Sequence, residues 1–112
     1  CVAAARLLLR HGAEGVLVSL GRDGAFLLGR EGLLLARAPE VEVRSSVGAG
    51  DAMLAWFTAA LLTGLPREEA LRRAVAAGSA ACLHYGTHAP SREEAEALLS
   101  RVGIDPAGNL PD

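Results

Sequence analysis

With 112 residues, the chain is long enough for one domain at most. It is 51% hydrophobic but only 4% aromatic, so its core must consist mainly of Ala, Leu and Val side chains, and its helices should pack closely. A formal net charge of −2, with no basic run, argues against a nucleic-acid-binding surface.

The cysteines and the apolar segments indicate the cellular setting. Cys1 and Cys82 lie far apart without the spacing of metal ligands, so neither a disulfide framework nor a metal site is predicted. No signal peptide is visible, and the apolar runs are too short to span a membrane. We therefore expect a cytoplasmic protein. Because the first residue is Cys1 and not Met, we also expect a fragment of a longer protein.

The first third of the chain reads as a helix followed by strands. Residues 1–11 mix Ala, Leu and Arg in a helical pattern that Gly12 ends. The apolar run at 15–20 is typical of a buried parallel strand. Two short strands, 25–28 and 33–36, follow as a hairpin, since a glycine-containing turn joins them.

A bend at Pro39 precedes a third short strand at 41–43, whose residues alternate between apolar and charged. This strand leads into the most informative stretch of the sequence, residues 45–51 (Ser-Ser-Val-Gly-Ala-Gly-Asp).

Residues 45–51 read as a strand-to-helix junction. Gly48 and Gly50 allow a sharp turn and leave room for a ligand beside the backbone. The next helix begins with unpaired N–H groups and a partial positive charge, which favour an anion such as phosphate. Asp51, in the first turn, could accept the proton of an attacking hydroxyl during phosphoryl transfer. A tight loop with Asp51 as a helix cap is the alternative.

A second glycine-containing turn lies at residues 19–24 (Ser-Leu-Gly-Arg-Asp-Gly), directly after the first predicted strand. A bend of this kind exposes backbone N–H groups to phosphate or ribose. A simple hairpin turn is the alternative interpretation.

The last half of the chain is predicted to be helical. Residues 51–63 are apolar on nearly every face, which indicates a core helix buried on all sides, or one whose surface missing sequence would cover. Gly64 ends this helix and Pro66 starts the next. The small residues at 74–83 allow the close approach of another helix or of a flat ring.

A capping box formed by Ser91 and Glu94 predicts the start of a last helix. Beyond Gly103 the tail should be loosely ordered. The order of elements implies an α/β layered domain, whose ligands would bind beyond the carboxyl ends of the strands.

Residues 46–53, Ser-Val-Gly-Ala-Gly-Asp-Ala-Met, resemble the C-terminal signature of the ribokinase-like (PfkB-type) carbohydrate kinases. The variant found here is most similar to the phosphosugar branch, which includes 1-phosphofructokinase and tagatose-6-phosphate kinase. Ser45 stands where the family usually has Asp or Asn. The turn at 19–24 resembles the family segment beneath the nucleotide, and residues 85–90 resemble its loop near the base.

The resemblance implies a ribokinase-like fold, which is a Rossmann-like layered sheet with flanking helices. This chain would supply the C-terminal part. Residues 1–102 would form the nucleotide-binding and catalytic portion, and residues 103–112 the loose tail.

The resemblance also implies roles for individual residues. Asp51 would be the catalytic base, and the N–H groups of Gly48, Ala49 and Gly50 would form an anion hole for the transferred phosphoryl group. The cofactors would be ATP and Mg²⁺. The nucleotide would be bound by Ser19, Gly21, Arg22, Asp23, Gly24, Gly78 and Cys82.

The implied function is an ATP-dependent sugar-phosphate kinase that phosphorylates a hydroxyl of a fructose 1-phosphate-type acceptor. By this resemblance the chain alone should be inactive, because most sugar contacts come from upstream sequence in the family. A related sugar or nucleoside kinase is one alternative, and a truncated non-catalytic nucleotide-binding or interaction module is another. Neither nucleic acid nor membrane is an expected partner. A homodimer and association with a missing N-terminal part both remain open.

Overall fold

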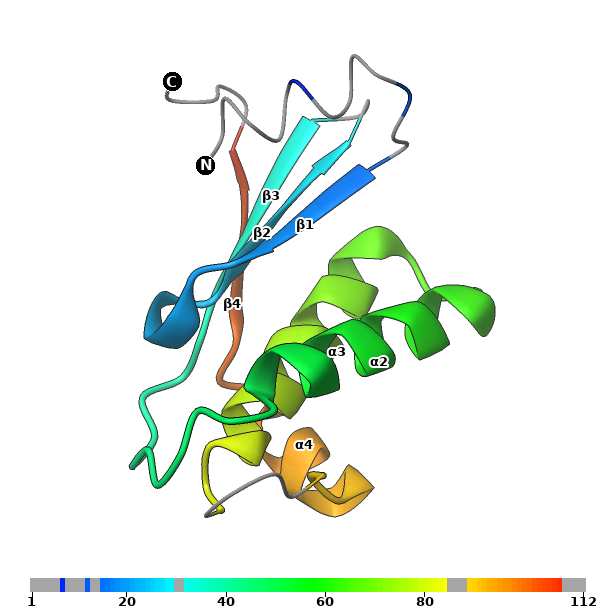
Figure 1. Ribbon diagram of the computed structural model, residues 1–112. Helices are drawn as coiled ribbons and strands as arrows, with labels where there is room; N and C mark the ends of the chain where they lie inside the picture. Colours follow the sequence, from blue (N-terminus) through cyan, green and yellow to red (C-terminus); the bar gives the residue numbers. More distant parts are fainter. Residues whose placement is uncertain (1–6, 8–11, 13–14, 30–31, 85–88, 108–112) are drawn as a thin grey trace.

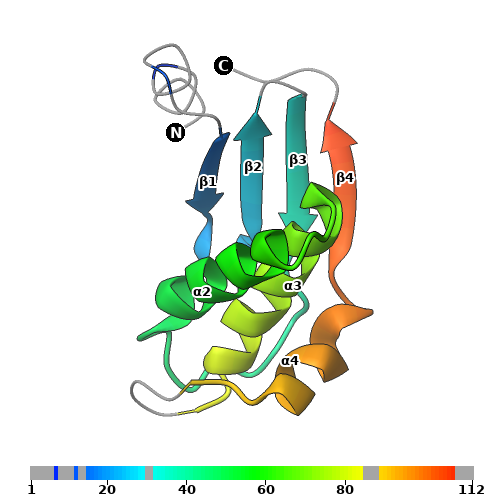
Figure 2. The ribbon, with the colours of Figure 1, turned by 90° about the vertical axis from the view of Figure 1, so that its right-hand side faces the viewer.

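The computed structural model describes the chain except for residues 1–6, 8–11, 13–14, 30–31, 85–88 and 108–112. Four strands form one sheet in the order β1 (Gly15–Ser19), β2 (Ala25–Gly29), β3 (Gly32–Arg37) and β4 (Gly103–Ala107). Three helices lie between β3 and β4 in sequence: α2 (Ala49–Leu62), α3 (Arg67–Ala81) and α4 (Arg92–Leu99). Figures 1 and 2 show these helices gathered on one side of the sheet.

The sheet separates two apolar clusters because its side chains alternate between its faces. On one face, Phe26, Leu28 and Leu33 pack with residues from β1. On the other face, Leu27 and Leu34 join the main core together with the buried side of α3. Strand β2 is buried along its whole length, since it carries apolar side chains on both faces.

Helix α3 lies at the centre of the core. Its second half, from Ala74 to Ala81, is buried at every residue. Small side chains let α2 come close: a Cβ added at Gly78 would lie 3.4 Å from the Ala49 carbonyl oxygen. The expected tight helix–helix packing is therefore confirmed for this position.

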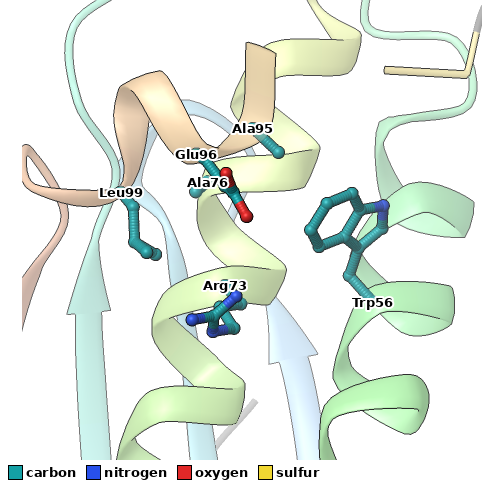
Figure 3. A pocket seen from close by; sticks show the side chains of 6 residues that line it. All are labelled: Trp56, Arg73, Ala76, Ala95, Glu96 and Leu99. Atoms are coloured by element: carbon teal, nitrogen blue, oxygen red, sulfur yellow. The ribbon is translucent and has the colours of Figure 1, made fainter. Parts of the chain in front are cut away.

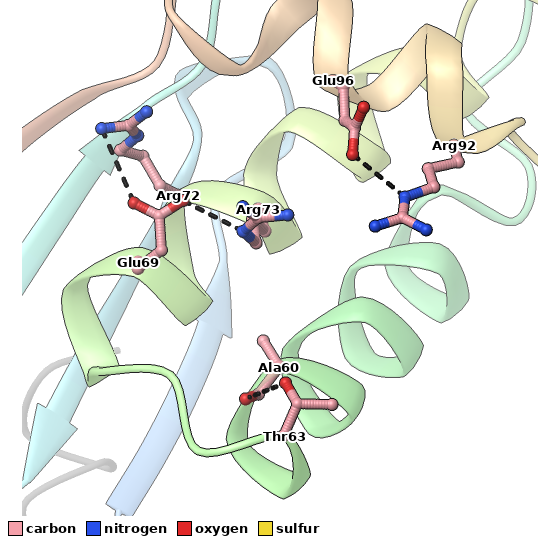
Figure 4. A network of polar contacts seen from close by, with 7 residues as sticks. All are labelled: Ala60, Thr63, Glu69, Arg72, Arg73, Arg92 and Glu96. Carbon is pink, nitrogen blue, oxygen red and sulfur yellow. Dashed lines mark hydrogen bonds and ion pairs between the residues drawn. The ribbon is translucent and has the colours of Figure 1, made fainter.

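Ion pairs lie on the outward-facing sides of α3 and α4 (Figure 4). Glu69 contacts Arg72 and Arg73 on α3, and Arg92 pairs with Glu96 on α4. At the end of α2, the Thr63 hydroxyl donates a hydrogen bond to the Ala60 carbonyl oxygen. The Arg92–Glu96 pair is exposed and the pairs of Glu69 are half-buried, and surface pairs contribute little, typically about 0.5 kcal/mol each, so packing decides the arrangement.

Two sequence-based predictions about strands are wrong. The run at 15–20 forms β1, but β1 is half-buried and pairs antiparallel with β2, because the turn at Leu20–Gly24 reverses the chain directly after it. The residues at 41–43 form no strand. They belong to an extended link that hydrogen bonds hold in place. One of these, 2.6 Å long, is donated by the Arg101 guanidinium to the Glu40 carbonyl oxygen.

Two further predictions about burial and order also need correction. Helix α2 is present, but only Met53 and Ala60 are buried, because α2 contacts α3 on one side only. The tail beyond Gly103 is not loose along its first five residues, since these form β4 and pair antiparallel with β3. A side-chain ion pair between Arg37 and Asp105 joins the same two strands.

The predicted helix at 1–11 and the core of the predicted loop at 85–90 lie largely outside the described residues. Among the helices that are described, none combines the length and hydrophobicity needed to span a membrane.

Candidate functional site

A cleft of about 920 Å³ lies between the end of β1, the link after β3 and the facing parts of α2 and α3. This volume is in the range of small-molecule and cofactor sites. All seven residues predicted to bind a nucleotide line it: Ser19, Gly21, Arg22, Asp23, Gly24, Gly78 and Cys82. Residues that are about sixty positions apart in the sequence thus face one space.

The turn after β1 forms a rigid part of the cleft wall. The Leu20 N–H donates a 2.8 Å hydrogen bond to the Gly24 carbonyl oxygen, which closes the turn. Gly24 has a positive φ of 114°, and a Cβ at this position would lie only 2.0 Å from the Ala36 carbonyl oxygen. Gly24 is therefore required by the fold itself, and the hairpin-turn interpretation is correct as a description of the local structure. The side chains of Arg22 and Asp23 are exposed at this turn.

The last turn of α3 forms the opposite wall. Burial raises the pKa of the Cys82 thiol, so the thiol stays neutral near pH 7. The Cys82 carbonyl oxygen accepts hydrogen bonds from the N–H groups of Arg44 (2.7 Å) and Ser45 (3.3 Å). These bonds attach the segment that leads into the glycine loop (residues 45–51) to the end of α3.

The glycine loop before α2 is preformed. Gly48 caps the helix in the left-handed conformation, with φ 84°, which a residue with a side chain rarely adopts. The Ala49 N–H contacts the Ser46 carbonyl oxygen at 3.2 Å, and the Ala52 N–H makes the first helical bond, 2.9 Å, to Gly48. Hydrogen bonds within the chain therefore fix the conformation of this loop.

The N-terminus of α2 is open. Amides in the first turn of a helix have no acceptor within the helix, so they are available to an anion, except for the Ala49 N–H, which donates a hydrogen bond to the Ser46 carbonyl oxygen. Within the described part of the chain, a Cβ added at Gly50 would meet no atom within 4 Å. The Asp51 carboxylate is exposed and has no ion pair or hydrogen bond among these same residues. The arrangement can bind an anion and accept a proton beside it.

Ala49 both lines the cleft and is the first residue of α2. It is the one predicted anion-hole residue that lines the cleft, whereas Gly48, Gly50 and Asp51 do not. The two predicted parts of the site therefore adjoin each other but do not form one enclosed pocket in this chain.

Sequence reasoning missed several cleft residues. Ser46 and Ser79 line the cleft, as does the link from Arg37 to Val41. Ser79 could have been found from its place as a hydroxyl in an otherwise alanine-rich helix segment. The link could not, because residues 37–40 carry no pattern typical of a ligand site and the alternation at 41–43 favoured a strand.

Other candidate sites are poorer. Trp56, Arg73 and Glu96 approach one another where α2, α3 and α4 meet (Figure 3), but the notch they line has no space for even a water molecule. Among the residues that the structure describes, no cluster of His, Cys, Asp and Glu side chains could hold a metal ion.

Comparison with known proteins identifies the family. Residues 1–95 match the model of the pfkB family carbohydrate kinases. The chain belongs to this family. It is 38% identical over 97 residues to a 1-phosphofructokinase of Bacillus subtilis, a match that covers 87% of this chain and 31% of that protein.

Solved structures of the family agree with the fold. The phosphofructokinase-2 of Escherichia coli in complex with potassium superposes with a TM-score of 0.83 at 37% identity, over 89% of this chain and 33% of that one. The ribokinase of Thermotoga maritima superposes with a TM-score of 0.82 at 31% identity, over 88% and 34%. The predicted ribokinase-like α/β fold is confirmed, and the chain spans about a third of the length of these relatives.

Proposed function

We propose that this chain supplies the nucleotide cleft and the phosphoryl-transfer loop of an ATP-dependent sugar-phosphate kinase similar to 1-phosphofructokinase. One observation carries the proposal: the seven predicted nucleotide-binding residues line a single cleft, which meets the open N-terminus of α2 at Ala49. Membership of the pfkB family supports it. All of these residues lie within residues 1–102, the proposed nucleotide-binding and catalytic portion.

Each part of the site has a role in this proposal. The turn at residues 19–24 and the end of α3, with Gly78 and Cys82, hold the nucleoside. The N–H groups of Gly48 and Gly50, joined by that of Ala49 once it exchanges its Ser46 acceptor for the ligand, stabilise the charge on the transferred phosphoryl group, helped by the partial positive charge of the helix terminus. Asp51 accepts the proton of the acceptor hydroxyl.

The cofactors in this proposal are ATP and Mg²⁺. Mg²⁺ is usually held by one or two carboxylates together with substrate phosphates, which fits a cleft without a cluster of metal-ligating side chains in the described residues. It would neutralise charge on the phosphate oxygens when bound. The open space above Gly50 leaves room for a phosphate close to the backbone.

The acceptor is a sugar phosphate of the fructose 1-phosphate type, a proposal supported by the name of the Bacillus subtilis relative. We also propose a cytoplasmic setting. A related sugar or nucleoside kinase remains the alternative within the family, since the ribokinase superposition is nearly as good. Because the chain spans a third of its relatives, we propose that it is inactive unless the other two-thirds of the fold accompany it.

A chimaera tests this function. In the Bacillus subtilis enzyme, this chain replaces the matched segment, and Asp51→Asn is introduced. We expect kcat to fall by about 10²- to 10⁴-fold, because a general base is lost, while the KM for ATP changes by less than about threefold. The matched control is Glu93→Gln on the exposed side of α4, which should leave both constants unchanged.

Near-normal kcat in the Asp51→Asn chimaera would contradict the role of Asp51. A chimaera that binds ATP but transfers no phosphoryl group to any sugar phosphate would favour the non-catalytic module.

A further inference from the structure

One wall of the cleft is a segment without regular secondary structure. Residues 38–41, in the link after β3, all line the cleft but belong to no helix or strand. The ladders of backbone hydrogen bonds that hold helices and strands in place therefore do not fix this wall. Its position must depend on packing and on side-chain contacts with neighbouring elements.

The C-terminal part of the chain supplies such a contact. Arg101 lies between α4 and β4, and its guanidinium donates a 2.6 Å hydrogen bond to the Glu40 carbonyl oxygen. A hydrogen bond from a charged donor is stronger than one between neutral groups. The bond holds the peptide that joins Glu40 to Val41, whose side chain packs against the main core. Rotation of this peptide would move cleft-lining residues on both sides of it.

The segment that carries Arg101 is itself firmly placed. Val102, the next residue, is buried in the main core, and Gly103 pairs with Arg37 at the start of β4. Figure 2 shows β4 beside β3 at the edge of the sheet. Arg101 therefore projects from a fixed base and reaches the link three residues after the link leaves β3.

The same wall supports the turn after β1. A Cβ at Gly24 would lie 2.9 Å from the Ala38 amide nitrogen, so the backbones of the turn and of the link are in contact. Close-packed groups transmit small displacements to one another. A shift of residues 38–41 would therefore also move the turn at residues 19–24, and the cleft would change shape on two of its sides.

We propose that Arg101 is a positioning residue for the nucleotide cleft, and that its hydrogen bond to the Glu40 carbonyl oxygen keeps residues 38–41 at the separation from α3 that a nucleoside requires. The inference rests on the proposed function for the identity of the ligand. It gives a role to a segment beyond residues 1–95, the part of the chain that matches the family model.

The proposal separates the two ends of the site. Without the bond, a smaller fraction of the chain has a correctly shaped cleft, and the apparent affinity for a nucleotide falls in proportion. The glycine loop is attached elsewhere, through the hydrogen bonds of the Arg44 and Ser45 N–H groups to the Cys82 carbonyl oxygen. The affinity of the α2 N-terminus for phosphate groups should therefore not depend on Arg101.

Binding of two ligands to the isolated chain tests the proposal. In Arg101→Ala, the Kd of a non-hydrolysable ATP analogue with Mg²⁺ should rise by about three- to tenfold, while that of free triphosphate should change by less than about twofold. Arg101→Lys should bring the Kd of the analogue to within about twofold of the wild type, because lysine can donate to the same carbonyl oxygen. The midpoint of thermal unfolding should shift by less than about 3 °C in both variants, since Arg101 is exposed.

The chimaera gives a second readout. There Arg101→Ala should raise the KM for ATP by a similar factor and leave kcat within about twofold of the wild type. The matched control is Arg92→Ala, which removes an exposed arginine and its contact with Glu96 from a part of α4 that does not line the cleft. It should leave both dissociation constants and both kinetic constants unchanged.

Three results would overturn this inference alone. They are equal affinities of the wild type and Arg101→Ala for the analogue, an equal loss of affinity for free triphosphate, which would indicate a general loosening of the fold, and a loss that Arg101→Lys does not reverse. A wild-type chain that binds neither ligand would instead overturn the proposed function, and this inference with it.

Discussion

Three glycines near the candidate site have different physical roles. Gly24 is required by packing, because a methyl group there would overlap the backbone of β3. Gly48 is required by conformation, since its φ lies in the left-handed region. Gly50 is helical with open space around it, so nothing in the described residues demands glycine there. The absence of a side chain at Gly50 is best explained by a ligand that approaches the backbone.

Gly50→Ala should therefore separate stability from function. In the isolated chain we expect the free energy of unfolding to rise by about 0.5–1 kcal/mol, because alanine is the better helix former. In the chimaera, kcat/KM should fall by at least tenfold, since the methyl group would occupy the space of the phosphoryl group. Denaturant unfolding, followed by the fluorescence of the single tryptophan, Trp56, gives the first quantity, and steady-state kinetics gives the second.

Gly48→Ala is the comparison variant for this experiment. It should lower the stability of the isolated chain by about 1–2 kcal/mol, because alanine is strained in the left-handed conformation. If Gly50→Ala lost stability to the same extent, the fold would explain both glycines and the ligand-based explanation would fail.

At the scale of elements, α4 shows how a short helix is fixed at its start. The Ser91 hydroxyl accepts a hydrogen bond from the Glu94 N–H, 3.1 Å, and the Glu94 carboxylate accepts one from the Ser91 N–H, 3.0 Å. The same carboxylate contacts the His84 ring beyond the end of α3. The hydrogen bond from Ser91, with a further contribution from His84, lowers the pKa of Glu94. The capping box thus also connects α4 to α3.

This arrangement predicts an acid-dependent stability. Because the pKa of Glu94 is lower in the folded state, its contribution is complete above the ordinary glutamate range near pH 4 and is lost as the pH falls through the lowered pKa. The difference in unfolding free energy between the wild type and Glu94→Gln should shrink as the pH falls below about 4. Chemical unfolding at a series of pH values measures it.

Ser91→Ala should lower the free energy of unfolding by about 1 kcal/mol at pH 7, the usual effect of losing a helix cap.

If the difference in unfolding free energy between the wild type and Glu94→Gln stayed the same down to pH 2, the ionised carboxylate would contribute nothing to stability.

The elements also show what the sequence could predict. Helices α2, α3 and α4 were predictable because their start and stop signals are local: Gly64, Pro66 and the Ser91–Glu94 box. Strand pairing was not, since the antiparallel partner of β1 is set by the closed turn at Leu20–Gly24 and by tertiary packing. Strand β4 was missed because its partner, β3, lies about seventy residues earlier.

The residues of the candidate site also divide into those that local sequence reveals and those that only the tertiary structure brings together. Its glycine loops could be found from the sequence because glycine marks special backbone geometry. Ser79 and the link after β3 contribute to the cleft only through the way α3 and the sheet come together. No local pattern reveals such residues.

At the scale of the whole molecule, two segments that are distant in sequence form one cleft, which we propose binds the nucleotide. The turn after β1 comes from the sheet, and Gly78 and Cys82 come from the helix layer that packs against it. Their meeting depends on the core beneath them, where α3 buries its alanines against β2 and β3. The cleft is therefore a property of the folded chain as a unit.

A titration of the ¹⁵N-labelled chain with a non-hydrolysable ATP analogue and Mg²⁺, followed by amide chemical shifts, shows whether the two segments bind one nucleotide. We predict saturable shifts at residues 19–24 and 78–82 together with residues 48–51, while the exposed residues of α4 stay unchanged. Free triphosphate should shift residues 48–51 alone. Absence of saturable shifts, or shifts confined to surfaces outside the cleft, would contradict the account.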